Sequence, residues 1–344
     1  MDLALTVDKR ELDGFEGLQE AVKGSHFDIT QLGRGKMSGS VSHIGIGDFT
    51  LSLSTFDRGI SAQRTAADEQ ILVGMLLSAA GRVTHWSFDL RPGDIVIIPP
   101  LAEHHAVHRD AASYAVIRLN PGEIPALFDE PRLRDEETWQ EKKRCRASHA
   151  IAVNATQILS RLATHLDSRS DTALSEGAAD FWKRTIADCM AMTIQNSLPA
   201  EKDSHLPPTL KLVRLMVDYL QTKGDRPVHV SEISTAVGLS RRSLHRWFHE
   251  IFGTGPVTFL RRRRLCAAYS ALKANSPLTT TVGDVAIEHG FIELGRFSHD
   301  YHVMFGEYPS QTLNAYPRVP AKLAGTFVPR AKRRRPLSTP ALAP

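Results

Sequence analysis

The amino-acid sequence predicts an α+β chain with two main domains. Residues 31–119 contain six or more short segments suited to β-strands, with glycines at or between them. Two amphipathic helical segments follow, and two helix-turn-helix patterns lie further along the chain. We therefore expect an N-terminal antiparallel β-barrel with a helical hairpin, followed by an all-α domain. At 344 residues the chain is long enough for both domains and a linker.

Charge is distributed unevenly along the chain. From residue 206 onward, 20 Lys and Arg residues face 9 Asp and Glu residues, which is a net charge of +11. The first 205 residues carry a net charge of −7, and the two parts together give the +4 of the whole chain. Only the basic part is therefore expected to bind a polyanion.

Composition indicates the compartment. Hydrophobic residues make up 42% and charged residues 23%, as in ordinary soluble globular proteins. The scattered Cys145, Cys189 and Cys266 form neither a disulfide framework nor a zinc cluster. The first residues lack the basic and apolar segments of a signal peptide, and the apolar runs 71–77 and 95–101 are too short to cross a bilayer. We expect a cytoplasmic protein without membrane contact.

The N-terminal half is interpreted as a lead-in, a sensor domain and a helical hairpin. Residues 1–30 are polar and show no period, so we expect a loose lead-in. Residues 31–146 should form a small antiparallel barrel or double sheet. Its strands are expected at Val41–Ile46, Thr50–Phe56, Ile71–Leu77, Thr84–Phe88, Asp94–Ile98 and Tyr114–Leu119.

Residues 147–198 should form the helical hairpin. Ile151–Leu166 and Ala173–Ser197 each place their apolar residues on one stripe. Such a stripe can pack on the chain's own barrel, or it can also form a homodimer. Residues 199–208 contain three prolines and should be a linker.

Residues 209–316 should form the helical domain, which opens with a helix at Thr209–Lys223. Each helix-turn-helix unit has a small residue four positions before a glycine, Ser234 before Gly238 and Ala286 before Gly290. The small residue lets two helices approach, and the glycine makes the turn that ends the first helix. Leu244 and Phe297 should anchor the second helices, Ser231 should cap the helix after it, and Ser240 should cap the first recognition helix.

One helix, Pro256–Ala274, should connect the two units. Its Arg261–Arg264 run is expected to point outward over a full turn and to contact phosphates, although a solvated face is the ordinary alternative. Residues 317–344 hold six prolines, seven Lys and Arg, and no acidic residue, so this tail should be disordered.

The outer faces of the recognition helices indicate DNA binding. An arginine on such a face, as at Arg242 or Arg246, can donate to both acceptors of a guanine edge. The second helix offers fewer charged donors, so the first should carry most of the sequence specificity. The expected DNA contacts are Ser240, Arg241, Arg242, His245, Arg246, Arg261, Arg262, Gly295, Arg296, Ser298, His299 and His302.

Residues 208–313 resemble the two-motif DNA-binding domain of AraC/XylS transcription regulators. The resemblance is carried by Gly290-Phe291, Phe297-Ser298, Tyr301, Phe305-Gly306 and Pro309-Ser310. Within that family, the segments 290–297 and 305–313 are most similar to the ethanolamine-operon regulators. Ser234 stands where alanine is usual, and Leu294-Gly295 replaces the usual polar pair of the second recognition helix. The resemblance implies that the chain is an activator whose partners are double-stranded DNA and RNA polymerase.

Residues 91–100 resemble the second half of a cupin barrel motif, and a cupin-like barrel is the usual sensor fold of that family. In cupin enzymes a histidine near this motif joins upstream histidines to bind a metal. The matching stretch 59–77 contains no histidine, so we expect no metal and no cofactor. The candidate residues for an effector pocket are Arg58, Arg64, His85, Trp86, His104 and His105.

The sequence therefore predicts a sequence-specific, ligand-responsive DNA-binding regulator. Its unknown small-molecule effector would be ethanolamine or another amine, or an anionic nucleotide bound by Arg58 and Arg64. Two alternatives stay open. One is a cupin-type metal-dependent enzyme fused to a DNA-binding module, and the other is an architectural DNA binder without a ligand.

Overall fold

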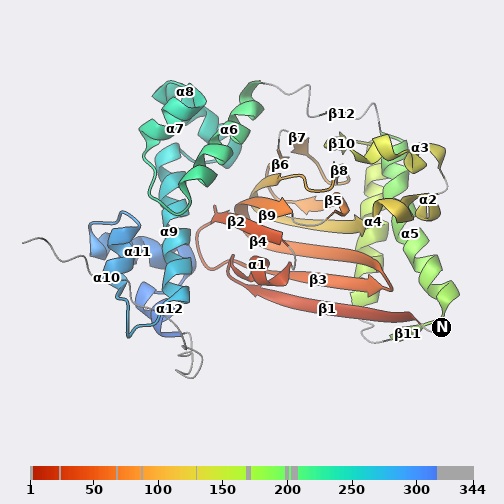
Figure 1. Ribbon diagram of the computed structural model, residues 1–344, viewed down its shortest axis with the longest axis horizontal. Helices are drawn as coiled ribbons and strands as arrows, with labels where there is room; N and C mark the ends of the chain where they lie inside the picture. Colours follow the sequence, from red (N-terminus) through yellow and green to blue (C-terminus); the bar gives the residue numbers. More distant parts are fainter. Residues whose placement is uncertain are drawn as a thin grey trace, which may run out of the picture.

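The computed structural model describes residues 3–22, 25–66, 69–86, 88–128, 130–167, 172–197, 201–202 and 208–315. Most of the predicted linker and all of the predicted basic tail beyond Ala315 lie outside these residues. Within them, no helix is long and apolar enough to cross a membrane. The described residues form an antiparallel sheet, two long helices on one side of the sheet and a helical domain on the other (Figure 1).

The sheet contains twelve strands within the described residues, in the order β11-β1-β3-β4-β9-β5-β8-β10-β12. Strand β2 pairs with β4, and the β6–β7 hairpin pairs with β9. The strand bounds are β1 Leu3–Asp13, β2 Ser25–Gln31, β3 Ser38–Ile46, β4 Phe49–Ala66, β5 Ile71–Ala79, β6 Val83–His85, β7 Phe88–Leu90, β8 Ile95–Ile98, β9 His104–Leu119, β10 Lys143–Cys145, β11 Thr172–Leu174 and β12 Glu201–Lys202.

The expected closed barrel is not formed. Among the described strands, β11 and β12 end the pairing order and do not pair with each other. Helices α4 (His149–Asp167) and α5 (Glu176–Gln195) instead pack against β1 and β3 as well as against β5 and β8. The helical hairpin therefore bridges the two halves of an open sheet, and its apolar stripe buries the core there.

The predicted lead-in is also wrong, because β1 occupies Leu3–Asp13 and pairs with β3 and β11. Within β1, Leu5 and Leu12 are buried, whereas the charged residues between them are exposed or half-buried. Because so few of its residues point into the core, the segment lacks the alternation of apolar and polar residues that predicts a strand. Five of the six predicted strands coincide with parts of observed strands, but β4 and β9 run for 18 and 16 residues. The predicted strand Thr84–Phe88 is wrong, because it joins the end of β6 to the start of β7, which pair as a hairpin.

Short helices connect the strands: the first follows β1, and the others lie in the chain between β9 and β10. They are α1 (Gly17–Ala21), the 3₁₀ turn Pro121–Glu123, α2 (Ile124–Leu127), α3 (Pro131–Arg134) and the 3₁₀ turn Glu136–Trp139. The last of these ends at Trp139, which is buried, stacks on Phe128 with ring centroids 5.4 Å apart, and donates from Nε1 to the Leu133 carbonyl at 2.8 Å.

The helical domain comprises α6 (Pro208–Lys223), α7 (Val230–Val237), α8 (Arg241–Phe252), α9 (Pro256–Ala274), α10 (Val282–Glu288), α11 (Leu294–Phe305) and α12 (Pro309–Ala315). Helix α9 has the predicted bounds and runs between the two helix-turn-helix units (Figure 1). The expected cap Ser231 is corrected: His229 caps α7, because its backbone N–H donates to the Glu232 carboxylate at 2.9 Å and its ring accepts from the Ser231 N–H.

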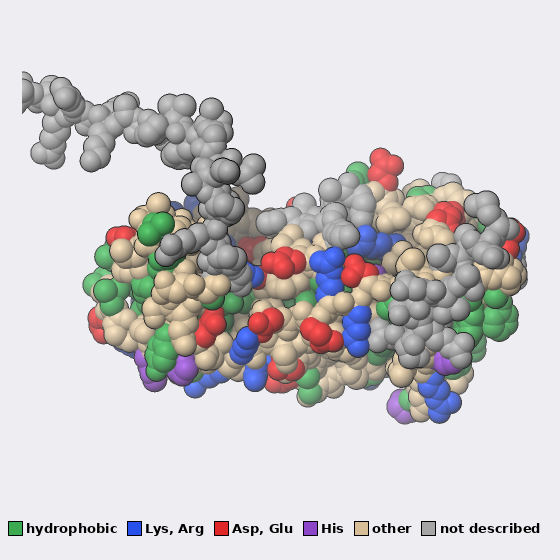
Figure 2. All heavy atoms as spheres, turned by 90° about the horizontal axis from the view of Figure 1, so that it is seen from below, with side chains coloured by type: hydrophobic (Ala, Val, Ile, Leu, Met, Phe, Trp, Pro, Cys, Tyr) green, Lys and Arg blue, Asp and Glu red, His purple; other side chains and the backbone are tan. Residues whose placement is uncertain are grey.

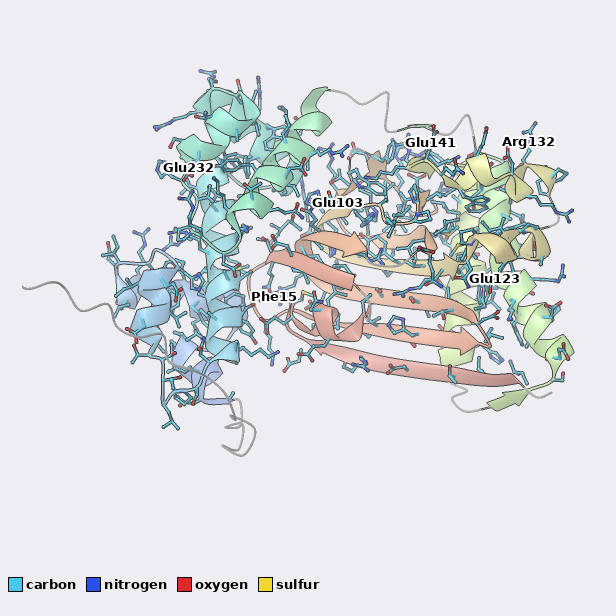
Figure 3. All side chains as sticks on the ribbon, viewed as in Figure 1. Phe15, Glu103, Glu123, Arg132, Glu141 and Glu232 are labelled. Atoms are coloured by element: carbon cyan, nitrogen blue, oxygen red, sulfur yellow. The ribbon has the colours of Figure 1, made fainter. Side chains whose placement is uncertain are left out.

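The sensor and the helical domain share a hydrophobic core. Phe15, which follows β1, packs on Tyr269 of α9 and on Phe305 of α11, with ring centroids 5.4 and 5.9 Å apart (Figure 3). Leu32 and Val107 of the sensor join the core of the first helix-turn-helix unit. Around this junction Lys and Arg side chains alternate with Asp and Glu on the face that Figure 2 shows. The two domains are therefore docked through apolar contacts rimmed by charges.

Candidate nucleic-acid interface

The first helix-turn-helix unit has the predicted geometry. Gly238 ends α7 in the left-handed conformation, with φ of 69°. The Ser234 hydroxyl donates to the Leu239 carbonyl at 2.5 Å, so it bridges the turn where an alanine could not. Ser240 caps α8 by accepting from the Ser243 N–H at 3.2 Å. Leu244 is fully buried and anchors the helix.

The outer face of α8 is open to solvent. Arg241, Arg242, His245 and Arg246 are all exposed, as is the cap Ser240. The first two turns of a recognition helix are where base edges and phosphates are contacted. The structure thus brings together on one exposed surface all five side chains that the sequence predicted for this helix.

The second unit presents a less charged surface. Gly290, with φ of 77°, makes the turn, and Phe291 packs on the buried Phe297 with ring centroids 4.9 Å apart. On α11, Gly295, Arg296 and His299 are exposed, whereas Ser298 and His302 are half-buried. The His302 ring stacks on Tyr308 at 4.3 Å.

The arginine run of α9 does not point outward over a full turn. A helix rotates by about 100° per residue, so four consecutive side chains cannot share one face. Arg263 is buried and donates to the Gly224 carbonyl at 2.7 Å. Arg264 donates to the Gly290 carbonyl at 2.8 Å and lies over the Phe291 ring. Arg261 forms an ion pair with Asp300. Arg262 is half-buried, and burial lowers the pKa of its guanidinium; the nearby charge of Arg34 lowers that pKa further.

Sensor residues hold the C-terminal ends of both recognition helices. Arg109 donates to the His249 and Ile251 carbonyls at 3.1 and 3.3 Å, and Arg82 donates to the Glu250 carbonyl at 2.8 Å. These cations meet the negative end of the α8 dipole. At the end of α11, Gln31 donates to the Met304 carbonyl at 3.0 Å. We call these contacts the helix-end clamp.

The sensor contains a cavity of about 160 Å³ between its strands. Its lining includes Arg64, His85 and His104, which are three of the candidate effector residues, together with His108 and Tyr114, which were not among the candidates. The other lining residues are mostly apolar, and the remaining polar ones are His43, Ser52, Ser54 and Arg118.

Three predicted effector residues lie elsewhere. Arg58 donates to the Lys36 carbonyl at 3.0 Å, and Trp86 donates to the Glu103 carbonyl at 2.8 Å. His105 shares a hydrogen bond of 3.1 Å with the Ser61 hydroxyl. Because successive side chains point to opposite faces of a strand, His105 cannot face the cavity that His104 lines.

Burial keeps His85, His104 and His108 of the cavity neutral near pH 7, because it lowers the pKa of each. Burial lowers the pKa of His85 to about 3 and that of His108 to about 4, and it lowers the pKa of His104 well below its ordinary value. Burial also raises the pKa of Tyr114. Both His85 ring nitrogens, His108 Nε2 and the Tyr114 hydroxyl have no hydrogen-bond partner among the described residues. No described carboxylate lines the cavity, so its only formal charges are the two arginines.

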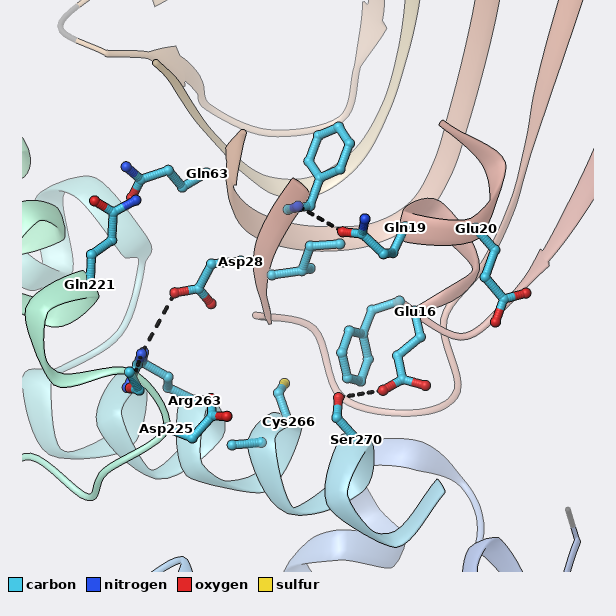
Figure 4. Close-up of a pocket in the computed structure, with 15 residues that line it drawn as sticks. Glu16, Gln19, Glu20, Asp28, Gln63, Gln221, Asp225, Arg263, Cys266 and Ser270 are labelled. Atoms are coloured by element: carbon cyan, nitrogen blue, oxygen red, sulfur yellow. Dashed lines mark hydrogen bonds and ion pairs between the residues drawn. The ribbon is translucent and has the colours of Figure 1, made fainter. Parts of the chain in front are cut away.

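A second hollow of about 600 Å³ separates the sensor from α6 and α9 (Figure 4). Its acidic residues are partly engaged: Asp28 lies 3.6 Å from Arg263, and Glu16 accepts from Ser270 and pairs with Lys273 at 3.1 Å. Within the described chain, no group of three or more His, Cys, Asp or Glu side chains is arranged to hold a metal ion.

Sequence reasoning missed Arg82, Arg109 and Gln31, as well as His108 and Tyr114 of the cavity. The clamp residues carry no local signal, because their partners lie 140 or more residues away. The alternation of His104, Ala106 and His108 along β9 could have identified His108 as a partner of His104, since residues i and i+2 share a face.

Comparison with known proteins shows what the helical domain is similar to. Residues 233–315 match the family model described as a helix-turn-helix domain. A probable thc operon regulatory protein of Rhodococcus erythropolis is 36% identical over 106 residues, which are 31% of this chain and 32% of that protein. The XylDLEGF operon transcriptional activator 2 of Pseudomonas putida is 30% identical over 101 residues, or 29% of this chain and 64% of that protein.

The matches therefore span about one third of the first relative and less than two thirds of the second. Among solved structures, a probable AraC family transcriptional regulator from Rhodopseudomonas palustris is 34% identical over 30% of this chain and 96% of that chain, with a TM-score of 0.28.

Proposed function

On the premise that its C-terminal part is a helix-turn-helix domain of the AraC/XylS family, we propose that this chain is a sequence-specific DNA-binding transcription regulator. The observation that carries the proposal is the pair of helix-turn-helix units joined by α9, with the basic face of α8 open to solvent. Two recognition helices on one chain can enter successive major-groove segments about 34 Å apart.

We propose that the two helix-turn-helix units make different contacts with DNA. Arg242, His245 and Arg246 of α8 would contact base edges, and Ser240 with Arg241 would contact phosphates. On α11, Arg296, Ser298, His299 and His302 are the proposed contacts. Arg261 lies close to Arg296 of α11, whereas the half-buried Arg262 lies close to Arg34. We propose that both strengthen the positive electrostatic potential around the DNA rather than contact phosphates directly, since Arg261 already pairs with Asp300.

The experiment that tests this function measures binding of the full chain to duplexes selected from a random pool. Because neutralised phosphates release counterions, the dissociation constant should rise steeply with salt. The selected duplex should bind roughly a thousandfold tighter than random duplexes at physiological salt. Failure to enrich any sequence, or binding that ignores salt, would refute the proposal.

We further propose that the sensor cavity binds the effector. An amine, as in the ethanolamine-operon regulators, fits poorly, because Arg64 and Arg118 are cationic and no described carboxylate lines the cavity. The lining favours a small anion with an apolar body, which could also accept from or donate to His85, His108 and Tyr114. Thermal shift with a panel of small carboxylates and matched amines tests this, and Arg64→Gln should remove any carboxylate shift.

The helix-end clamp supplies a route from cavity to DNA. His108 lines the cavity, and its neighbour Arg109 on β9 holds the end of α8. A ligand that displaces β9 would therefore shift the population of arrangements that α8 can adopt. Activation through RNA polymerase and a homodimer through α4 and α5 remain proposals from the family resemblance.

A further inference from the structure

Gly295 is the second residue of the second recognition helix, and nothing in the described chain requires a glycine there. Its φ is not among the positive values that favour glycine. A Cβ built at this position would meet no heavy atom of the described residues within 4 Å. By contrast, Gly290 and Gly306, which flank the same helix, have φ of 77° and 76°.

A glycine within a helix destabilises it relative to alanine, because the unfolded chain has more freedom to lose. The glycine at Gly295 therefore weakens α11 without relieving strain or a clash inside the protein. A partner that approaches the helix backbone at this point would use the missing side chain, because a Cβ would stand in its way. On the first turn of a recognition helix, that partner is the duplex.

The neighbours of Gly295 are unusually apolar for an exposed surface. Ile292 in the turn is 93% exposed, and Leu294 at the start of α11 is 47% exposed. Arg296 is exposed on the other side, close enough to Arg261 for their charges to repel each other. An apolar edge beside two guanidinium groups matches a major groove, where thymine methyl groups lie between phosphate rows.

We propose that α11 docks on the major groove with its backbone at Gly295 lying directly against the DNA, while Leu294 and Ile292 contact thymine methyl groups. The second unit thus recognises its half-site by close approach and apolar contact, whereas the first uses hydrogen bonds from Arg242 and Arg246. This inference rests on the proposed function and names the specificity of its second half.

The first experiment compares Gly295→Ala with Gly177→Ala in the full chain. Gly177 is also the second residue of a helix, α5, and a Cβ there would likewise meet nothing within 4 Å among the described residues. Both variants should keep or slightly raise the melting temperature, by about 1–3 °C. Only Gly295→Ala should weaken binding to the selected duplex, by roughly tenfold in Kd.

The second experiment replaces thymine by deoxyuridine, which lacks the methyl group, in the half-site protected by the second unit. Binding of the wild-type chain should weaken several-fold. Leu294→Ala should reduce this difference between the two duplexes, and the double variant with Ile292→Ala should bind them equally. If Gly295→Ala binds the selected duplex as tightly as Gly177→Ala, or if deoxyuridine changes nothing, the proposal is overturned. A wild-type chain that selects no duplex at all would overturn the proposed function instead.

Discussion

Acid should destabilise the sensor well above the pH at which its carboxylates protonate. Burial lowers the pKa of His85 to about 3 and those of His105 and His108 to about 4, against an ordinary value of 6.5. The unfolded chain then binds more protons than the folded chain between pH 6.5 and about 4. The stability linked to these histidines is fully present above pH 6.5 and is lost as the pH falls through this window.

The size of the effect follows from the two pKa values. Between pH 7.5 and 5.5, protonation stabilises each histidine of the unfolded chain by about 1.4 kcal/mol, because its ordinary pKa lies midway between these two pH values. His85, His105 and His108 together should lower the free energy of unfolding by about 4 kcal/mol, and His104, whose pKa burial also lowers, should add to that loss. That is a large share of the roughly 5–15 kcal/mol typical of folded domains.

Urea unfolding at pH 7.5 and 5.5, followed by tryptophan fluorescence and circular dichroism, measures this difference. His108→Gln should reduce the pH-dependent loss by about 1.4 kcal/mol, whereas the matched change at the exposed His149 should leave it intact. A loss below about 1 kcal/mol in the wild-type chain, or an equal loss in His108→Gln, would refute the reasoning from burial.

Three further outcomes are expected. Arg246→Ala should cost roughly 1–3 kcal/mol on the selected duplex and much less on random duplexes, whereas Arg262→Ala should weaken both about equally; parallel losses in Arg246→Ala would remove that side chain from base readout. Arg109→Ala removes two charged hydrogen bonds from the end of α8, which stabilise that turn by about 1–2 kcal/mol after solvent screening. Amide hydrogen exchange in the last turn of α8 should therefore become about 5–30-fold faster. The control variant Arg91→Ala, at an exposed position, should leave this exchange rate unchanged. Purified protein should hold no stoichiometric metal by elemental analysis, and about one metal per chain that disappears in His104→Ala would contradict this.

The sequence by itself determined the helical domain, because its signals are local. A small residue four positions before a glycine, an apolar anchor six or seven positions after it and, in the first unit, a serine cap all act within one turn-and-helix unit. The bounds of α9 and the exposed face of α8 follow from the same periodicity of 3.6 residues. Such features depend on nearest neighbours along the chain, so they can be inferred without the fold.

The tertiary structure decided the features that depend on contacts between residues far apart in the sequence. The polar texture of residues 3–13 hid a strand, because pairing with β3 and β11, rather than burial along its length, holds it in place. The arginine run of α9 contains one buried member and one that ties α9 to the turn at Gly290, and both assignments depend on partners distant in sequence. The cavity and the helix-end clamp likewise join residues from distant strands and helices. Local patterns determine which elements form, but only the packed chain determines which side chains meet.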